Sequence, residues 1–339
     1  MKPPTAHPLL NEPVRVTLDP PTPAPSTETG HVLLCPGQGA QHVGMGRLWA
    51  QAHPIARRTF DHADELLNMP LSKLCFEGPA EQLNRTDVAQ AAIYVTTVAA
   101  HRALTATGQI GSAAATAGLS LGEFTALHLA GAFDFATGLK LVRLRGEAMQ
   151  AASAAQAGGM VAIISVDEAK VEDLCLKVLD RVAPEHRLLV PANFNCPRQI
   201  VVSGSQQACE TTLVVAQEMG VAAKALPVAG AFHSPIMAPA ARRLAQALDA
   251  TDWSTPTVPV LSNVTGAPHD TANIESIKGL LVEQLTRPVR WEASMRWLTD
   301  HMPSHEQLPY AELPPGNVLS GLMRRIERKT KVLSFAEPA

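Results

Sequence analysis

The sequence predicts an α/β protein made of a larger core and an inserted subdomain of the ferredoxin-like βαββαβ plan. Short apolar runs closed by glycine or proline are typical of buried strands, and they recur between longer helical patterns. Between residues 159 and 229 the order of these patterns becomes strand, helix, strand, strand, helix, strand. The chain has 339 residues, 46% hydrophobic and 17% charged, which is ample for a large core and excludes global disorder.

The core begins with an expected strand at residues 31–35, because this apolar run ends at Pro36-Gly37. Next come helical patterns at 47–67 and 88–107, a small-residue strand at 113–117, and helical patterns at 123–131 and 135–155. After the insertion we expect a helix near 235–249, a strand at 258–262, and helices near 274–285 and 316–328.

The inserted subdomain is expected at residues 159–229, with the core at 31–158 and 230–330. Its strands are predicted at 160–165, 188–192, 199–202 and 221–227, and its helices at 167–180 and 205–219. Residues 1–30 contain eight prolines, which favour extended polyproline II, so a disordered leader is expected there. Residues 331–339 are expected to form a C-terminal tail.

Composition excludes several classes of protein. The net charge of −3 and the 4% of aromatic residues argue against nucleic-acid binding. The five cysteines are scattered and include no C-x-x-C pair, so neither a disulfide framework nor a zinc site is indicated. No segment resembles an apolar 20-mer or a signal peptide, so we expect no membrane contact and a cytoplasmic protein.

The strongest local motif is the G-x-S-x-G sequence of residues 118–122. It lies between a small-residue strand and a helical pattern, where two glycines permit a sharp turn that presents Ser120 at a helix N-terminus. The N–H of Leu121 would then be placed to stabilise an oxyanion. An ordinary glycine-rich turn is the alternative interpretation.

Serine needs a general base, and His233 is the best candidate. It lies in a tight loop, GAFHSP at residues 230–235, after a strand and before a helix, where catalytic bases commonly lie. A structural loop histidine is at least as compatible with the pattern.

Two further residues have a possible role in such a site. Gln38 lies in the glycine-rich loop PGQGAQ of residues 36–41, which lacks the features of a nucleotide-binding loop but can bring an amide close to a reacting carbonyl. Arg145 lies between apolar residues of a helical pattern, where a buried guanidinium could bind a carboxylate. A solvated arginine is the alternative.

Together these motifs resemble the malonyl-CoA:acyl-carrier-protein transacylase family, and the acyltransferase domains of polyketide and fatty-acid synthases. The resemblance covers about residues 31–330. Its landmarks occur in the family's order: PGQGAQ at 36–41, QAAI at 90–93, GLSLGEF at 118–124, LRGEAM at 144–149, NCPRQIVVSG at 195–204, AFHSP at 231–235, SNVTG at 262–266, PVRW at 288–291 and GNVLSGL at 316–322.

The resemblance implies a role for each of these residues. Ser120 would be the nucleophile that takes the malonyl group from malonyl-CoA, and His233 its general base. The backbone N–H groups of Gln38 and Leu121 would form the oxyanion hole, and Arg145 would pair with the free malonyl carboxylate. The acceptor would be the phosphopantetheine thiol of an acyl carrier protein, in fatty-acid or polyketide synthesis.

The resemblance also implies three supporting residues. A backbone carbonyl in the segment 288–291, at Arg290, would orient the catalytic histidine. Gln90 belongs to a family landmark beside the site, and the ring of Phe232 would crowd an α-methyl branch, which favours malonyl over methylmalonyl groups. The implied fold is a hydrolase-like parallel-sheet core carrying a ferredoxin-like subdomain, and the implied enzyme is a monomer that needs no metal or other cofactor.

The sequence departs from the family pattern in two places. Leu119 stands where many members have histidine, and the segment from Glu312 to Gly316 reads ELPPG instead of Glu-x-Gly-Pro-Gly. The first leaves the nucleophile in place, and the second concerns the shape of one loop.

A basic segment offers a candidate docking face for an acidic carrier protein. Residues 321–331 contain five cationic side chains and one glutamate. Cations also stabilise the C-terminus of a helix, so a solvated helix end is the simpler interpretation.

Three other interpretations remain open at this stage. A serine esterase or thioesterase would use the same turn with water as acceptor, and Asp134 is one of several acidic residues that could complete its triad. A non-catalytic docking module would retain only the fold, although it has no need of Ser120, His233, Arg145 or Gln38. A stand-alone polyketide acyltransferase would perform the same reaction in another pathway.

Overall fold

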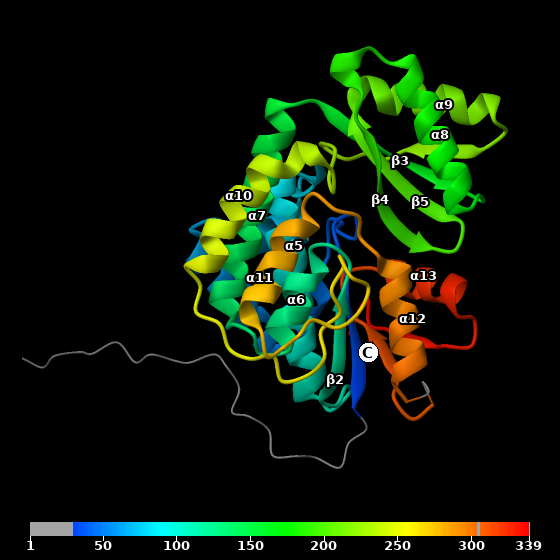
Figure 1. Ribbon diagram of the computed structural model, residues 1–339. Helices are drawn as coiled ribbons and strands as arrows, with labels where there is room; N and C mark the ends of the chain where they lie inside the picture. Colours follow the sequence, from blue (N-terminus) through cyan, green and yellow to red (C-terminus); the bar gives the residue numbers. More distant parts are fainter. Residues whose placement is uncertain (1–29, 304–305, 339) are drawn as a thin grey trace, which may run out of the picture.

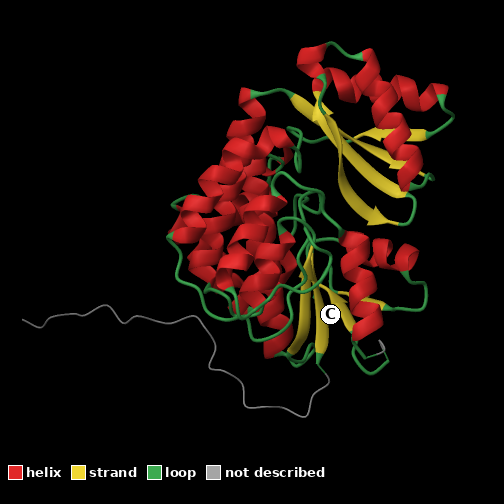
Figure 2. Cartoon of the chain, viewed as in Figure 1, coloured by secondary structure: helices red, strands yellow, loops and turns green. Residues whose placement is uncertain are grey.

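The computed structural model describes residues 30–303 and 306–338, so the leader expected at residues 1–30 lies, apart from Gly30, outside the described part of the chain. Within that part the strands form two separate sheets, one in the core and one in a smaller subdomain (Figures 1 and 2). No helix of the described residues is long and apolar enough to cross a membrane.

The core sheet is parallel, with strand order β2-β1-β7-β8. Its strands are β1 (His31–Cys35), β2 (Ala113–Gly118), β7 (Tyr310–Glu312) and β8 (Val332–Ser334). The tail expected at residues 331–339 therefore contributes an edge strand, since Val332, Leu333 and Ser334 pair with β7.

The two faces of β1 bury their side chains against different helices, as alternation along a strand requires. Leu33 and Cys35 belong to the larger hydrophobic cluster, and Val32 and Leu34 belong to a smaller one. Helices α5, α6, α7, α10 and α11 lie on one side of the sheet and α12 and α13 on the other (Figure 1). The core is therefore a three-layer α/β/α structure.

The core helices are α1 (Arg47–Ala52), α2 (Pro54–Leu67), α3 (Leu71–Glu77), α4 (Ala80–Leu83), α5 (Thr86–Ala106), α6 (Gly122–Leu129), α7 (Phe135–Ala155), α10 (Ala238–Asp249), α11 (Ile274–Gln284), α12 (Trp291–His301) and α13 (Val318–Ile326). A short 3-10 turn, Pro235–Met237, precedes α10. The single helix expected at 47–67 is two helices, because His53 is extended and Pro54 starts α2.

The second sheet has strand order β4-β5-β3-β6, and every neighbouring pair is antiparallel. Strands β3 (Gly158–Ile164) and β4 (Leu189–Cys196) are thus parallel to each other with β5 (Gln199–Ser205) between them. By the same logic, β5 and β6 (Ala222–Ala225) run parallel on either side of β3. Two interleaved βαβ units of this kind are the ferredoxin-like arrangement, so the expected fold class is confirmed.

The two faces of this second sheet have different roles. Helices α8 (Glu168–Arg181) and α9 (Gln206–Glu218) cover one face, where Val161 and Ile163 form their own cluster; a 3-10 turn at Pro184–His186 follows α8. Met160 and Val201 point from the other face toward the core. The subdomain therefore forms one wall of a cleft.

One expected strand is absent as a continuous element from the described core. Residues 258–262 form only single bridges, Val260 with Thr116 of β2 and Leu261 with Pro268. They nevertheless extend the edge of the core sheet, because Thr116 and Leu261 also share a backbone hydrogen bond of 3.0 Å.

Candidate active site

The turn between β2 and α6 presents Ser120 above the carboxyl end of the core sheet. Ser120 has φ 52°, a strained left-handed conformation for a serine. A Cβ atom at Gly118 would collide with the backbone of Gly122, and one at Gly122 would collide with the backbone of Cys35. Only glycine fits at either position, so the predicted nucleophile elbow is present.

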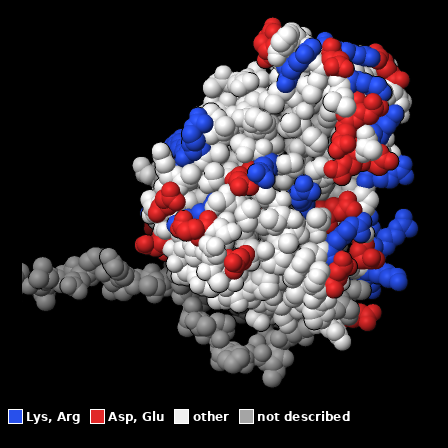
Figure 3. Space-filling model, in the orientation of Figure 1, with Lys and Arg blue, Asp and Glu red and all other residues white. Residues whose placement is uncertain are grey.

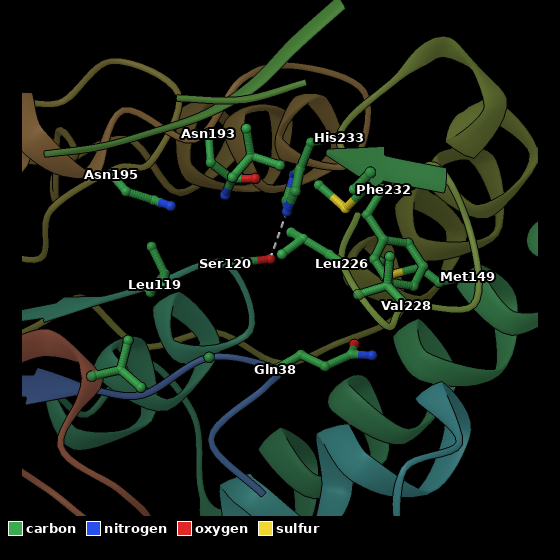
Figure 4. Close-up of a pocket in the computed structure, with 14 residues that line it drawn as sticks. Gln38, Leu119, Ser120, Met149, Asn193, Asn195, Leu226, Val228, Phe232 and His233 are labelled. Atoms are coloured by element: carbon green, nitrogen blue, oxygen red, sulfur yellow. Dashed lines mark hydrogen bonds between the residues drawn. The ribbon is translucent and has the colours of Figure 1, made fainter. Parts of the chain in front are cut away.

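His233 is in position to act as the base for Ser120. Its Nε2 lies 2.8 Å from Ser120 Oγ, and its Nδ1 lies 2.7 Å from the carbonyl oxygen of Gln284 (Figure 4). Because a carbonyl oxygen only accepts, Nδ1 carries the proton and Nε2 is free to take the serine proton. Burial, and then the charge of Arg145, lowers the pKa of His233 to about 4 despite the Gln284 carbonyl, so the imidazole is neutral at pH 7.

The carbonyl that orients His233 corrects the expectation for Arg290. The backbone of Arg290 instead donates to the carbonyl of Asn263 and accepts the Ser294 N–H in the first turn of α12. Its guanidinium lies over the Phe194 ring, 5.8 Å from the ring centroid. The assignment was wrong because α11 ends at Gln284 and turns its last carbonyl into the site, a feature with no local sequence signal.

Arg145 is buried beside the nucleophile, as the resemblance implies. Its exposed fraction is 1%, and its Nη2 donates to Ser120 Oγ at 3.0 Å and to Gln284 Oε1 at 2.9 Å. Nη1 donates to Gln90 Oε1 at 2.7 Å, so the Gln90 carboxamide helps to hold the guanidinium in place. Burial lowers the pKa of Arg145 to about 10, against an opposing effect of Glu123, so the guanidinium stays charged at pH 7.

Two backbone N–H groups are available as an oxyanion hole. Among the described residues, the N–H groups of Gln38 and Leu121 have no hydrogen-bond acceptor. Their loops touch, because a Cβ atom at Gly37 would collide with the carbonyl oxygen of Leu119. Two unpaired donors on adjoining loops beside a nucleophile suit a tetrahedral oxyanion.

The residues around Ser120 enclose a cleft of about 220 Å³ between the core and the subdomain. Asn193 and Asn195 lie on one side of Ser120, and Phe232 and Met149 lie on the other (Figure 4). The cleft thus has a polar wall and an apolar wall. The ring of Phe232 lines the cleft on the apolar side.

Sequence reasoning missed three buried polar residues that hold this geometry. Asn263 Oδ1 accepts the Ser120 N–H at 2.6 Å, and Asn263 Nδ2 donates to the Gly118 carbonyl at 2.8 Å. Gln284 contacts Arg145 and His233, and Glu123 contacts Gln284. Asn263 and Glu123 belong to the landmark segments 262–266 and 118–124 quoted above, whereas Gln284 lies outside all of these segments.

Within residues 30–303 and 306–338, the group that orients His233 is not the carboxylate that a Ser-His-Asp hydrolase would use. His233 Nδ1 is taken by a backbone carbonyl, and Asp134 accepts the Thr137 N–H at the start of α7. The arrangement can form and break an acyl-serine ester, with a buried cation close to the acyl group.

Comparisons with known proteins agree with this geometry. The family model described as "Acyl transferase domain" matches residues 32–323. The chain is 41% identical over 308 residues to the malonyl CoA-acyl carrier protein transacylase of Bacillus subtilis, covering 90% of this chain and 93% of that relative.

Solved structures give the same result. The malonyl-CoA:acyl carrier protein transacylase of Xanthomonas oryzae pv. oryzae superimposes with a TM-score of 0.84 at 39% identity, covering 92% of this chain and 96% of that one. A malonyl-transacylase solved in complex with a type II PKS acyl-carrier protein has a TM-score of 0.83 at 33% identity, covering 91% and 97%.

Proposed function

The chain belongs to the acyl transferase domain family, and from this premise we propose that it transfers a malonyl group from malonyl-CoA to the phosphopantetheine thiol of an acyl carrier protein. The observation that carries the proposal is the position of Arg145, a buried guanidinium 3.0 Å from the nucleophile Ser120. A neutral acyl group has no negative charge to pair with this cation, whereas the free carboxylate of a malonyl group would form an ion pair with it.

The first half-reaction loads the enzyme. His233 Nε2 takes the proton of Ser120 Oγ as Oγ attacks the thioester carbonyl of malonyl-CoA. The N–H groups of Gln38 and Leu121 stabilise the oxyanion. The carbon–sulfur bond then breaks, and His233 returns its proton to the departing coenzyme A thiolate, which leaves a malonyl ester on Ser120.

The second half-reaction reverses these roles. His233 takes the proton of the phosphopantetheine thiol, and the sulfur attacks the malonyl ester through the same oxyanion hole. The carbon–oxygen bond to Ser120 breaks, and Ser120 Oγ recovers the proton from His233. Both transfers are proton-balanced and need no metal or redox cofactor.

Arg145 gives the site its selectivity. Its Nη2 holds Ser120 Oγ and Gln284 Oε1, and its Nε has no partner among the described residues. A malonyl carboxylate can satisfy that donor, whereas an acetyl group leaves the guanidinium without its counter-ion. Phe232 lines the same cleft, and crowding of an α-methyl branch by its ring would favour malonyl over methylmalonyl groups.

A basic surface formed by the subdomain and the C-terminal part of the core supports a carrier protein as the acceptor. We define it by its six exposed cations: Arg198, Arg324, Arg325, Arg328, Lys329 and Lys331. Figure 3 shows Lys and Arg side chains on the side of the molecule that carries α13, interspersed with Asp and Glu. None of the six forms an ion pair within the described residues. The basic surface includes residues of both parts of the fold. Arg198 belongs to the subdomain, and it lines one hollow together with three arginines of the core, Arg324, Arg325 and Arg328.

The proposed enzyme works as a single chain in the cytoplasm. Ser120, His233, Arg145 and Gln284 all come from one chain, so no second copy is needed to complete the site. The five cysteines are buried and unpaired, which suits a reducing compartment. One relative was solved with a type II PKS acyl-carrier protein, and others are named only for malonyl transfer to an acyl carrier protein, so we propose fatty-acid or polyketide synthesis as the pathway.

The test is intact-protein mass spectrometry after brief mixing with malonyl-CoA, acetyl-CoA or methylmalonyl-CoA. We expect a malonyl adduct on the wild type, none on Ser120→Ala, and little adduct with the other two thioesters. Addition of an acyl carrier protein should then discharge the adduct to the carrier. Steady release of coenzyme A with no adduct would instead indicate a thioesterase.

A further inference from the structure

A buried carboxylate lies directly behind the nucleophile elbow. Glu123, in the first turn of α6, has an exposed fraction of 0%. It accepts hydrogen bonds from His269 Nε2 at 2.7 Å, from Gln284 Nε2 at 2.6 Å and from Asn263 N at 3.1 Å. Asn263 N and Gln284 Nε2 can only donate, so Glu123 serves as the acceptor for both.

The carboxamide of Gln284 connects this anion to the active-site cation. Its Oε1 accepts from Arg145 Nη2 at 2.9 Å, and its Nε2 donates to Glu123 and, at 3.0 Å, to the Ser120 carbonyl. A cation on one side and an anion on the other fix which way the amide faces. The backbone carbonyl of Gln284 holds His233 Nδ1, so Gln284 contacts both functional groups of the site.

We propose that Glu123 and His269 are positioning residues that act through Gln284 to place both Arg145 and His233 for malonyl transfer. The inference rests on the function proposed above. Its physical basis is that a buried guanidinium needs a nearby anion, and Glu123 supplies one without occupying the face that the substrate carboxylate must reach.

The contribution of His269 is a single hydrogen bond. Its side chain is fully buried, Nε2 holds Glu123 Oε1, and Nδ1 has no partner among the described residues. Its backbone N–H donates to the Val260 carbonyl at 2.8 Å, which ties it to the sheet edge beside β2. A glutamine could supply the same donor, whereas a leucine could not.

The first test compares malonylation and acetylation rate constants in single-turnover mass spectrometry. Glu123→Gln should lower the malonylation rate about 100-fold, because small displacements of catalytic groups have effects of this size. It should also lower the preference for malonyl-CoA over acetyl-CoA, because Arg145 loses its fixed position. The matched control is Asp64→Asn, which removes a carboxylate that accepts the Ser72 N–H outside the cleft. This control should leave the preference unchanged.

Substitutions of His269 and Gln284 separate positioning from a general loss of stability. His269→Leu should reduce malonylation about tenfold, and His269→Gln should restore most of it, as expected for loss and return of one charge-assisted hydrogen bond of about 1.4 kcal/mol. Glu123→Gln in a Gln284→Met background should add little, because the carboxamide link is already cut. Thermal unfolding followed by circular dichroism checks that each variant is folded. If Glu123→Gln does not fold, the comparison of malonylation and acetylation is made on His269→Leu.

The outcomes distinguish this inference from the proposed function. Three results together support the inference: loss of malonyl preference in Glu123→Gln, malonylation that is slow in His269→Leu but largely retained in His269→Gln, and non-additive effects of Glu123→Gln and Gln284→Met. A variant that is slower with malonyl-CoA and acetyl-CoA by the same factor, or effects that add, would overturn it and leave malonyl transfer intact. Absence of a malonyl adduct on the wild type would overturn both.

Discussion

His233 is held neutral by its surroundings. Burial and the neighbouring charge of Arg145 lower the pKa of its imidazole from 6.5 to about 4, and the Gln284 carbonyl only partly opposes them. The neutral form is the one that accepts the Ser120 proton, so the base remains ready well below neutral pH. Arg145, which we propose selects the substrate, therefore also helps burial to keep this base neutral.

This shift predicts the pH dependence of malonylation. The second-order rate constant for malonylation of wild-type protein should be flat from about pH 8 to about pH 5, and should fall as the free enzyme's base is protonated near pH 4. Quenched-flow mass spectrometry measures the rate, and NMR titration of His233 gives its pKa directly. An inflection near 6.5 in either profile would contradict the prediction.

Folding stability must be monitored in the same range, because the lowered pKa also affects it. Between pH 6.5 and about 4 the unfolded chain binds a proton at His233 that the folded chain does not bind. The contribution of this group is therefore fully present above pH 6.5 and is lost as the pH falls toward 4. Short reaction times and parallel unfolding curves separate this effect from that on catalysis.

Replacing Arg145 should invert the substrate preference. Arg145→Met keeps an unbranched apolar stem but removes the guanidinium, which leaves a malonyl carboxylate buried without a partner; this costs about 2–5 kcal/mol and lowers malonylation by about 30-fold or more. Acetylation should be unchanged or faster, because an acetyl group has no carboxylate that pairs with the guanidinium. The measurement is the ratio of the two acylation rates, and equal losses with both substrates would contradict the assigned role. The His233 pKa should also rise in this variant, since a neighbouring positive charge is removed.

The elbow between β2 and α6 depends on glycine because backbone segments meet there. A Cβ atom at Gly122 would meet the backbone of Cys35 and Pro36 at the end of β1. We expect Gly122→Ala to destabilise the fold by about 1–3 kcal/mol and to abolish malonylation, because strand and helix must move apart. Chemical denaturation and the mass-spectrometric assay check the two effects.

Gly279 provides the matched control for this substitution. It lies within α11, and a Cβ atom there has nothing within 4 Å. Gly279→Ala should stabilise the protein by up to about 1 kcal/mol, because alanine is the better helix former, and should retain activity. A stable and active Gly122→Ala variant would show that the close approach at the elbow is not required.

The elements that the sequence predicted correctly are those specified by local patterns. The elbow and the βαββαβ order depend on glycine positions and apolar runs that are visible without tertiary information. Strands β7 and β8 have three residues each, too few to show alternation, and exist because they pair beside β1. Helix α12 was overlooked although its buried positions follow helical spacing, because one of them is Ser294, which weakens the apolar stripe.

The same distinction applies within the site. Ser120 and Arg145 were identifiable from residue type and motif, and the structure brings them within 3.0 Å. The orienting carbonyl could not be found that way, because any residue carries a carbonyl and only the path of the chain decides which one reaches His233. Gln284, and not Arg290, has that role because α11 ends at Gln284 with its carbonyl 2.7 Å from His233 Nδ1.

The core and the subdomain both contribute to the entrance of the cleft. Asn193 and Asn195 come from β4, whereas Val318, at the start of α13, comes from the core. The basic surface spans the same boundary, because Arg325 Nη1 donates to Gln199 Oε1 at 3.4 Å. A partner that engages this surface would contact both parts of the fold and direct a flexible prosthetic arm toward Ser120.

Charge reversal on the basic surface should therefore weaken the second half-reaction selectively. The double variant Arg324→Glu/Arg328→Glu should raise the KM for the carrier protein about tenfold, equivalent to about 1.4 kcal/mol, and reduce the salt dependence of the transfer. Malonylation by malonyl-CoA should be unchanged. The control, Arg58→Glu/Arg242→Glu, makes the same change in net charge at exposed positions outside this surface.

The two half-reactions, measured separately over a salt series, decide where these arginines act. Long-range attraction between an acidic carrier and exposed cations is screened by salt, so the wild type should slow as ionic strength rises while the variant changes little. An equal loss in both half-reactions would assign the arginines to the phosphates of coenzyme A instead. An equal loss in the control variant would show that only overall charge matters, because the position of the cations would then be irrelevant to recognition.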